Sequence, residues 1–358
     1  MRRRLGWIGA VASMAAAALV GLNPLPADAH GGGTTFQQVN LVSDQPGVAG
    51  PPDSDLVNPW GMSHGPNTPI WVSNNGSDNT TLYRTDTPGS PVTKVPLVVS
   101  IPGGAPTGQV FNDTAAFPVP GAGNNTKALF IFAGEDGGLS AWNGTAGTTA
   151  VAVGPPGNGA VYKGLALVHS PLGPVLLAAN FHDNRLDVFD GDFTPQAPDS
   201  RLFHDPFLPR GYAPFNVAEI GNQVFVTYAL QGPTGDDVAG AGHGFVDVFT
   251  NFGAFVHRFA SRGVLNSPWG LAVAPASFGS FAGDVLIGNF GDGRIHAFDP
   301  NTGHLRGTLV DAKHKPIAID GLWGLIVGDA VAGGADSVWF SAGPDDESHG
   351  LLGLLRAG

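Results

Sequence analysis

Short apolar runs separated by turn residues recur along the whole chain. The stretch 266–303 shows this most clearly, because its three apolar runs, GLAVA, DVLIGNF and RIHAF, are divided by Gly, Pro, Asn and Asp. Runs of this length with such punctuation predict antiparallel strands joined by tight turns. One small sheet cannot bury both of its faces, whereas copies stacked side by side can. The pattern therefore predicts a repeat protein.

The repeat has a period of roughly fifty residues. Its clearest openings are PWGM at 59–62, PWGL at 268–271 and LWGL at 322–325, and weaker counterparts are DTAA at 113–116, YKGL at 162–165 and APFN at 213–216. The second strands are predicted at 70–75, 129–135, 175–181, 224–229, 285–290 and 338–343, and the third at 81–86, 139–144, 185–191, 245–251, 294–300 and 351–355. Six such units predict an all-β, six-bladed β-propeller with four-stranded antiparallel blades.

The last unit ends after three predicted strands. The segment 36–42, FQQVNLV, precedes the first unit and has no hairpin partner of its own. We expect it to supply the outer strand of the last blade, which closes the ring and leaves no open sheet edge there. Residues 36–358 then form a single domain. Two stacked β-sandwiches are the alternative architecture.

The first 29 residues have the features of a cleavable signal peptide. Arg2, Arg3 and Arg4 form a basic start, residues 5–22 are apolar, and 27–29 read Ala-Asp-Ala, a small-residue cleavage site. A single membrane anchor is the alternative, since the apolar stretch approaches spanning length. We expect export to the periplasm or the exterior, by either the general or the twin-arginine route. Residues 30–35 (HGGGTT) are expected to be a flexible tail, and the mature chain to contain no membrane span.

The composition excludes several classes of function. The formal net charge is −12, and it becomes −14 when residues 1–29, with three Arg and one Asp, are removed. Nucleic acids and anionic lipids require clustered Lys and Arg, so neither is an expected partner. The chain has no cysteine, which excludes disulfides, thiolate metal ligands and thiol nucleophiles. We expect a monomer that binds a small molecule or another protein.

The predicted loops between second and third strands are rich in Asn and Asp. Asn74, Asn180 and Asn289 end the second strands of alternate blades and are expected to ring the mouth of the central channel. The predicted ligand-binding residues are Asn74, Asn180, His182, Asp183, Asn289 and Asp292. Converging amide and carboxylate oxygens suit Ca²⁺ or another divalent cation, for which the expected ligands are Asn180, Asn289, Asp113 and Asp320. In the alternative interpretation these residues only form turns.

Other features offer further hypotheses. Histidines near strand ends could bind a transition metal or act as a general base: His64, His182, His243 and His349. Cleavage after Ala29 would expose His30, whose amine and imidazole could chelate Cu²⁺. The long loop Gln231–Gly244, with Asp236 and Asp237, could form a flap over the channel.

Several strings carry a family resemblance. The runs IGNFGDGRIHAFDPNTG (287–303), IDGLWGL (319–325), NLVSDQPGVA (40–49) and NPWGM (58–62) resemble an uncharacterised family of exported bacterial proteins related to NHL-repeat and SMP-30-like six-bladed propellers. The resemblance implies the fold. In the wider group, lactonases and lyases hold a divalent cation in the channel, and Asn180 and Asn289 could match such ligands. The first strand of blade one has Met62 and His64 where those enzymes have a ligating Glu.

Two functions therefore stay open. The first is a non-enzymatic binding module that uses the polar loops around the channel. The second is a hydrolase or lyase of the SMP-30 type, in which a divalent cation polarises a carbonyl or activates water. Whether the protein is an enzyme does not follow from the residues alone.

Overall fold

A computed structural model describes residues 33–358 apart from 51, 86–90, 122, 124–126 and 158. The predicted signal peptide and residues 30–32 of the expected tail lie outside the described residues. Residues 34–358 form one compact unit. Thr34 and Thr35 are held against it, because Thr34 Oγ1 accepts a hydrogen bond from Ser280 N–H (2.9 Å) and the Thr35 carbonyl accepts one from Gly358 N–H (2.8 Å). Among the described residues, no helix is long and apolar enough to cross a membrane.

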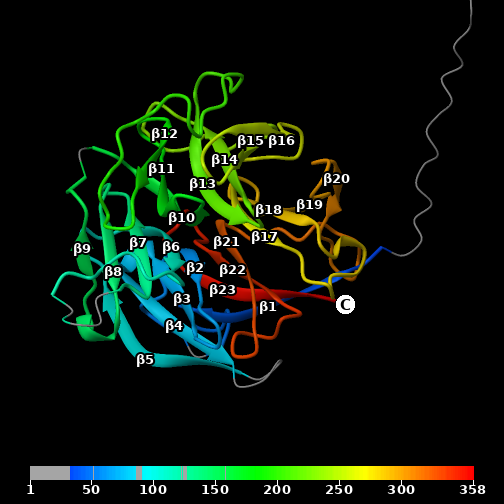
Figure 1. Cartoon of the computed structure of the whole chain (residues 1–358). Helices are drawn as coiled ribbons and strands as arrows, with labels where there is room; N and C mark the ends of the chain where they lie inside the picture. Colours follow the sequence, from blue (N-terminus) through cyan, green and yellow to red (C-terminus); the bar gives the residue numbers. More distant parts are fainter. Residues whose placement is uncertain (1–32, 51, 86–90, 122, 124–126, 158) are drawn as a thin grey trace, which may run out of the picture. The chain divides into compact units, whose positions relative to one another are not determined.

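The strands form six antiparallel sheets arranged as the blades of a propeller (Figure 1). Blade one contains β2 (Pro59–Ser63), β3 (Ile70–Asn74), β4 (Asn79–Thr85) and β5 (Val92–Ser100). Blade two contains β6 (Pro106–Phe111), β7 (Phe130–Gly134), β8 (Leu139–Trp142) and β9 (Val151–Val153). Blade three contains β10 (Tyr162–Ser170), β11 (Gly173–Asn180) and β12 (Arg185–Phe189). Blade four contains β13 (Tyr212–Ile220), β14 (Gln223–Leu230), β15 (Gly244–Thr250) and β16 (Phe255–Ser261). Blade five contains β17 (Pro268–Val273), β18 (Val285–Asn289), β19 (Ile295–Phe298) and β20 (Leu305–Thr308). Short 3-10 helices are η1 (Asn75–Ser77), η2 (Gly144–Ala146) and η3 (Gly279–Phe281).

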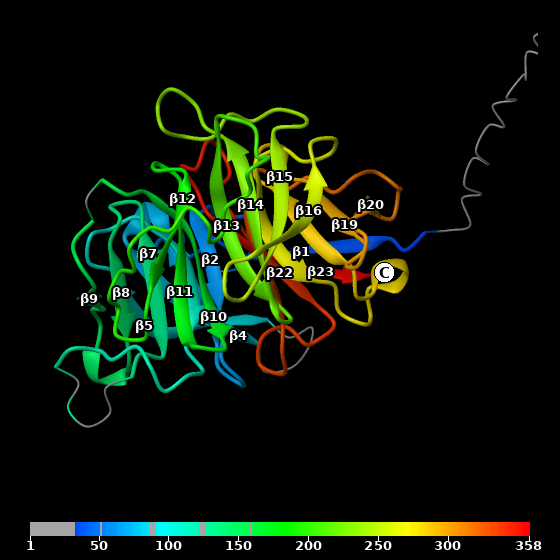
Figure 2. The ribbon, with the colours of Figure 1, turned by 45° about the horizontal axis from the view of Figure 1, so that its top comes forward.

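Blade six confirms the predicted closure of the ring. Its strand order is β1 (Phe36–Ser43), β23 (Leu351–Ala357), β22 (Val338–Ala342) and β21 (Leu322–Val327). β1 runs antiparallel to β23, with Phe36 opposite Ala357 and Ser43 opposite Leu351. Figures 1 and 2 show these two strands side by side. The first and last strands of the chain therefore share one sheet.

Two blades differ from the expectation. Blade two begins at Pro106 rather than at residue 113, so the string DTAA is not its inner strand. The sequence pattern does not predict this inner strand, because Thr107 and Gln109 interrupt it with polar residues. Both find buried partners on neighbouring blades, since Thr107 Oγ1 donates to the Tyr162 carbonyl (2.7 Å) and Gln109 Nε2 to the Gly61 carbonyl (2.9 Å). Blade three has three strands among its described residues, not the expected four.

The inner strands of the blades approach one another closely around the channel. Glycine is the third residue of most of them, because little space separates the neighbouring backbones. A Cβ added at Gly61 would lie 2.4 Å from the carbonyl oxygen of Thr107, and one at Gly324 would lie 2.6 Å from that of Trp60. Real Cβ atoms do not come this close to backbone, so the glycines allow the tight ring. Between adjacent blades, the side chains form layered hydrophobic cores.

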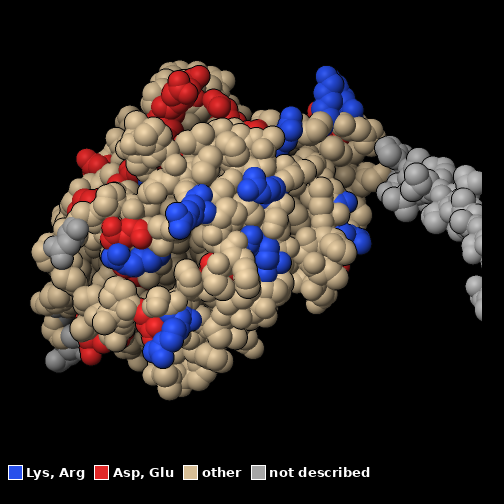
Figure 3. Space-filling view, turned by 90° about the horizontal axis from the view of Figure 1, so that it is seen from above, with Lys and Arg blue, Asp and Glu red and all other residues tan. Residues whose placement is uncertain are grey.

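On the face seen in Figure 3, charged side chains are sparse, and several Lys and Arg side chains stand beside Asp or Glu.

Candidate ligand site in the central channel

Three tryptophans fill one half of the channel. Trp60, Trp269 and Trp323 occupy the same repeat position, the second residue of an inner strand. Trp60 stacks on Trp323 with 3.5 Å between ring centroids, and Trp269 meets Trp323 edge-on at 5.8 Å. Phe181, Phe215 and Phe290 complete a buried cluster, which we call the aromatic plug. It lies near the loops between second and third strands, since the start of each inner strand pairs with the end of the second strand.

Lys163 takes the same repeat position in blade three. Its side chain is 6% exposed, and its Nζ lies 5.2 Å from the Trp60 ring centroid. Nζ also lies 2.5 Å from Glu135 Oε1 and 3.8 Å from Asp236 Oδ1. The plug therefore contains one buried cation, which is neutralised by Glu135 and also attracted to the aromatic face.

The loop Gln231–Gly244 reaches this end of the channel. Its Asp236 lies near Lys163, and the Gly240 N–H donates to Asn266 Oδ1 at 2.6 Å. Burial raises the pKa of Asp237, and burial also raises the pKa of Glu347, a residue of the blade-six loop. Glu347 Oε1 accepts a hydrogen bond from Asn58 Nδ2 (3.2 Å). Carboxylates, one lysine and amide groups thus cover the plug.

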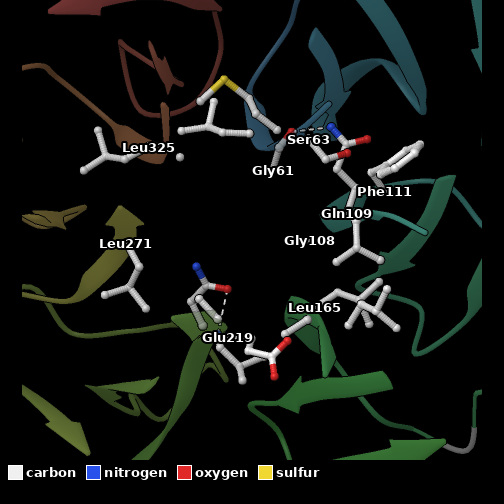
Figure 4. A pocket seen from close by; sticks show the side chains of 18 of the residues that line it. Gly61, Ser63, Gly108, Gln109, Phe111, Leu165, Glu219, Leu271 and Leu325 are labelled. Carbon is white, nitrogen blue, oxygen red and sulfur yellow. Dashed lines mark hydrogen bonds between the residues drawn. The ribbon is translucent and has the colours of Figure 1, made fainter. Parts of the chain in front are cut away.

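The other half of the channel contains a cavity of about 410 Å³. Figure 4 shows side chains from different blades arranged around this open space. Its apolar wall comes from the later residues of the inner strands: Met62, Phe111, Leu165, Leu271 and Leu325. The cavity opens toward the loops between first and second strands, because its lining includes residues just beyond the inner strands, such as Asp113. We call it the channel pocket.

A row of three charged groups crosses one side of the channel pocket. His169 Nδ1 lies 2.6 Å from Glu219 Oε2, and His169 Nε2 lies 3.0 Å from Asp113 Oδ1. The hydrogen bond to Glu219 is the main cause that raises the pKa of His169, and the bond to Asp113 adds to it. Glu219 is the least exposed of the three, with 13% of its side chain accessible. Two carboxylates beside one imidazole make this row net negative whether or not the imidazole carries a proton.

Two polar atoms in the same pocket have no hydrogen-bond partner among the described residues. They are Ser63 Oγ and Gln109 Oε1, whose residues are 6% and 5% exposed. Buried polar atoms are normally paired, but these two atoms are themselves buried, so a ligand in the pocket would reach them only after a side chain moved. No Lys or Arg is found among the described residues that line it. The pocket is therefore apolar with an acidic side.

The three predicted asparagines do occupy equivalent strand ends. Asn74, Asn180 and Asn289 pair with Pro59, Tyr162 and Pro268 at the start of their inner strands. All three are fully buried, and none lines the channel pocket. Their amides hold nearby segments together. Asn74 Nδ2 donates to Thr81 Oγ1 (2.9 Å), Asn180 Nδ2 to Asp187 Oδ2 (2.8 Å) and Asn289 Nδ2 to the Val264 carbonyl (2.8 Å).

The other predicted ligand residues also interact locally. His182 Nδ1 lies 2.9 Å from Asp183 Oδ1, and Asp183 also accepts from Asn180. Asp292 Oδ1 accepts from Asn289 Nδ2 (3.1 Å) and from the Arg294 N–H (3.2 Å). These are the bonds of turn-forming residues. A role in ligand binding stays a prediction for them.

The four residues expected to bind a divalent cation are not brought together. Asp113 bonds His169 near the end of β10, whereas Asn180 lies opposite Tyr162 at the start of that strand. Asp320 accepts a hydrogen bond from the Asp345 N–H (3.0 Å), and Asn289 belongs to another blade. Within the described ranges, no group of three or more His, Asp or Glu side chains is arranged to hold a metal ion.

Sequence reasoning missed the residues that are most distinctive in the channel. Lys163 had a usable signal, because YKGL aligns with PWGM and places a lysine where other repeats have tryptophan. Asp113 was predicted as a cation ligand, but no sequence signal joined it to His169 and Glu219. These three residues come from three blades, and only the closed ring brings them side by side.

Comparison with known proteins identifies relatives along most of the chain. "Uncharacterized protein R648" of Acanthamoeba polyphaga mimivirus is 32% identical over 338 residues, covering 90% of this chain and 80% of the viral protein. "Uncharacterized protein L690" of the same virus is 32% identical over 340 residues, covering 90% and 86%. The chain belongs to the family of these two proteins. The relatives found are thus viral, not the exported bacterial proteins that the sequence strings resemble. No protein-family model matches the chain.

Solved structures resemble the chain in fold. The α-L-arabinanase of Penicillium chrysogenum, complexed with arabinobiose, has a TM-score of 0.56 and 13% identity, with 90% of this chain and 98% of that one covered. A structural genomics protein of unknown function from Bacteroides thetaiotaomicron has a TM-score of 0.53 and 12% identity, with 90% and 76% covered. At such low identity these likenesses concern the fold alone.

Proposed function

We propose that this propeller is a binding module for a small organic cation with an apolar body, and that the channel pocket is its site. One observation carries the proposal. The scarcely exposed carboxylate of Glu219 faces a cavity of about 410 Å³ with leucine-rich walls and no Lys or Arg among its described lining residues. Small-molecule sites typically combine an apolar cavity with a few placed polar groups.

Physical chemistry favours a cation over a neutral or anionic ligand. The row of Asp113, His169 and Glu219 is net negative, and opposite charges attract more strongly in a partly dehydrated cavity than in bulk water. An ammonium group could donate to Glu219, which lines the pocket. The apolar part of the ligand would replace water against Leu271 and Leu325.

A divalent-metal hydrolase or lyase has less support. Such an enzyme needs several oxygen or nitrogen ligands around one point. Asn180, Asn289, Asp113 and Asp320 do not supply them, because Asp113 lies at the far end of the inner strands from Asn180. The geometry of the described side chains therefore favours binding over metal-assisted catalysis.

The test uses three probes that share a phenethyl body and differ in headgroup charge: phenethylammonium, phenethyl alcohol and 3-phenylpropanoate. Thermal unfolding of the wild type should shift upward with phenethylammonium in a saturable manner, since a ligand that binds only the folded state stabilises it. The neutral probe should shift it less and the anion least. Glu219→Gln should remove the preference for the cation, and Leu271→Trp should abolish binding by filling the cavity.

Asp346→Asn is the matched control. It removes one exposed carboxylate from the loop that covers the opposite end of the channel, so phenethylammonium should bind it as it binds the wild type. Equal shifts for all three probes, or an unchanged shift in both Glu219→Gln and Leu271→Trp, would contradict the proposal.

A further inference from the structure

The outer edge of blade three is only partly paired. The other five sheets have four strands, whereas β12 is the last described strand of blade three. The chain turns back after β12 and pairs only briefly, with Phe189 opposite Pro195 and a hydrogen bond of 2.8 Å from the Gln196 N–H to the Val188 carbonyl. It then leaves the sheet.

Proline explains why this pairing stops. In the register set by Phe189 and Pro195, the next residue to bond the edge is residue 198, opposite Leu186. Residue 198 is a proline, which has no N–H to donate. Among the described residues, neither the N–H nor the C=O of Leu186 has a hydrogen-bond partner on this edge. One rung of the ladder is left unpaired.

A groove lies beside this partly paired edge, and β11 and the blade-four turn at Asn251 and Phe252 also contribute to its lining. It has a volume of about 550 Å³ and lies between Leu186–Val188 of β12 and the departing segment Gln196–Asp199. Three of the large hydrophobic side chains that the protein exposes stand at this groove: Leu172 (94% exposed), Leu202 (45%) and Phe252 (55%). Exposed apolar side chains gathered around a concave surface are typical of interaction sites.

The charges at the groove select the kind of partner. Asp187, Asp190 and Asp199 line it, and no Lys or Arg is found among its described lining residues, although Arg185 Nε, just outside the lining, lies 2.6 Å from Asp187 Oδ1. Arg201, which pairs with Asp199, is 86% exposed. The whole chain has a net charge of −12. A partner segment with basic side chains would thus be attracted, and one with acidic side chains repelled.

We propose that blade three binds an extended peptide segment of another protein as its fourth strand, and that this segment alternates apolar and basic side chains. Its backbone pairs with the free N–H and C=O of Leu186. Its apolar side chains enter the groove beside Leu186 and Val188, and its basic side chains lie on the other face, near the carboxylates. Addition of a strand to an exposed sheet edge is a general mode of peptide recognition.

The probe is an end-blocked, fluorescently labelled peptide, Lys-Val-Lys-Leu-Lys-Val-Lys, followed by fluorescence anisotropy. The wild type should bind it saturably, and Glu-Val-Glu-Leu-Glu-Val-Glu should bind at least about tenfold more weakly. Amide hydrogen exchange at Leu186 should slow when the basic peptide is bound, because its N–H becomes paired. Unchanged exchange at Leu186 would overturn strand addition.

Three variants sharpen the test. Ala197→Trp, which fills the groove, should weaken binding by about tenfold or more, whereas Ala239→Trp on an exposed part of the loop Gln231–Gly244 should not. Pro198→Val restores an N–H opposite Leu186, so the protein's own chain should compete and peptide affinity should fall. Equal binding by the two Trp variants would overturn the proposal. So would sedimentation showing that the wild type self-associates through this face without binding the peptide.

Discussion

The two halves of the central channel are lined by the same six inner strands, yet one half is filled and the other is hollow. At the second residue of these strands, three tryptophans meet one another and leave no space. A few residues later, Met62, Leu271 and Leu325 stand back from the axis and enclose the channel pocket. The comparison teaches that side-chain size at one repeat position decides whether a propeller channel is plugged. The pocket is a consequence of smaller residues, not of a different backbone.

The largest effect is expected from opening the plug. Trp323→Ala should lower the free energy of unfolding by about 3–5 kcal/mol, because it removes a fully buried ring that contacts Trp60, Trp269 and Phe290. Leu325→Ala should cost only about 2 kcal/mol, the low end for a buried leucine, because the space that it leaves joins the existing pocket. Urea denaturation of both variants measures the difference. Similar losses would show that the two halves are packed alike.

The second largest effect is expected from removing the buried charge of Lys163. Lys163→Met should destabilise the protein by about 2 kcal/mol, because Glu135 loses a charged partner while the methionine still packs on Trp60. It should also speed amide exchange around Asp236, which lies near Lys163. Lys313→Met, at an exposed position, should change stability by less than about 0.5 kcal/mol. An equal effect of the two substitutions would mean that Lys163 does not hold the loop.

His296 inside a blade and His169 at the rim of the channel pocket have pKa values shifted in opposite directions. Burial lowers the pKa of His296 to about 4, so the unfolded chain binds its proton first as the pH falls below about 6.5. Stability should therefore be lost as the pH falls from 6.5 toward 4, by about 2 kcal/mol between pH 7 and pH 5. His296→Gln should remove this part of the pH dependence, as measured by denaturation at the two pH values. An unchanged slope would show that other groups cause the acid sensitivity.

The smallest effect concerns His169, whose contribution to stability changes with pH in the opposite direction. Its pKa is raised, so its contribution to stability is complete below about pH 6.5 and is lost as the pH rises through the raised pKa. The ion pairs are half exposed, so the contribution should not exceed about 1 kcal/mol.

In Glu219→Gln the pKa of His169 should fall toward its ordinary value, and NMR titration of the imidazole measures it. Asp346→Asn serves again as the control, because this exposed carboxylate belongs to a loop at the other end of the channel. A fall of the same size in both variants would mean that general charge, not contact, sets the pKa.

The blade count and the ring closure could be predicted because both depend on patterns within short segments of the sequence. The recurring WG motif and the unpaired segment 36–42 required no knowledge of distant contacts. Blade two was misplaced because Thr107 and Gln109 are polar in isolation, and only their bonds to neighbouring blades make them suitable for an inner strand. The missing fourth strand of blade three depends on Pro198, whose register to Leu186 is visible only after folding.

The site was harder to predict than the fold. Asn74, Asn180 and Asn289 were correctly placed at equivalent strand ends, but the sequence does not say which way an amide points. Here the amides turn into the blades and hold loops. The pocket lies at the other end of the channel, where Asp113, His169 and Glu219 meet across three blades. Export, the monomeric state and the absence of a nucleic-acid partner stay predictions.

The pairing of β1 with β23 has a consequence for how the molecule is made. The ribosome synthesises Phe36–Ser43 about 300 residues before its neighbour Leu351–Ala357. Until β23 has emerged, the sixth sheet cannot form and the ring of blades cannot close, even if the earlier blades have already folded. A truncation that removes β23 should therefore prevent closure of the whole ring. A circular permutant, in which the present ends are joined and new ends are placed between two other blades, should still fold.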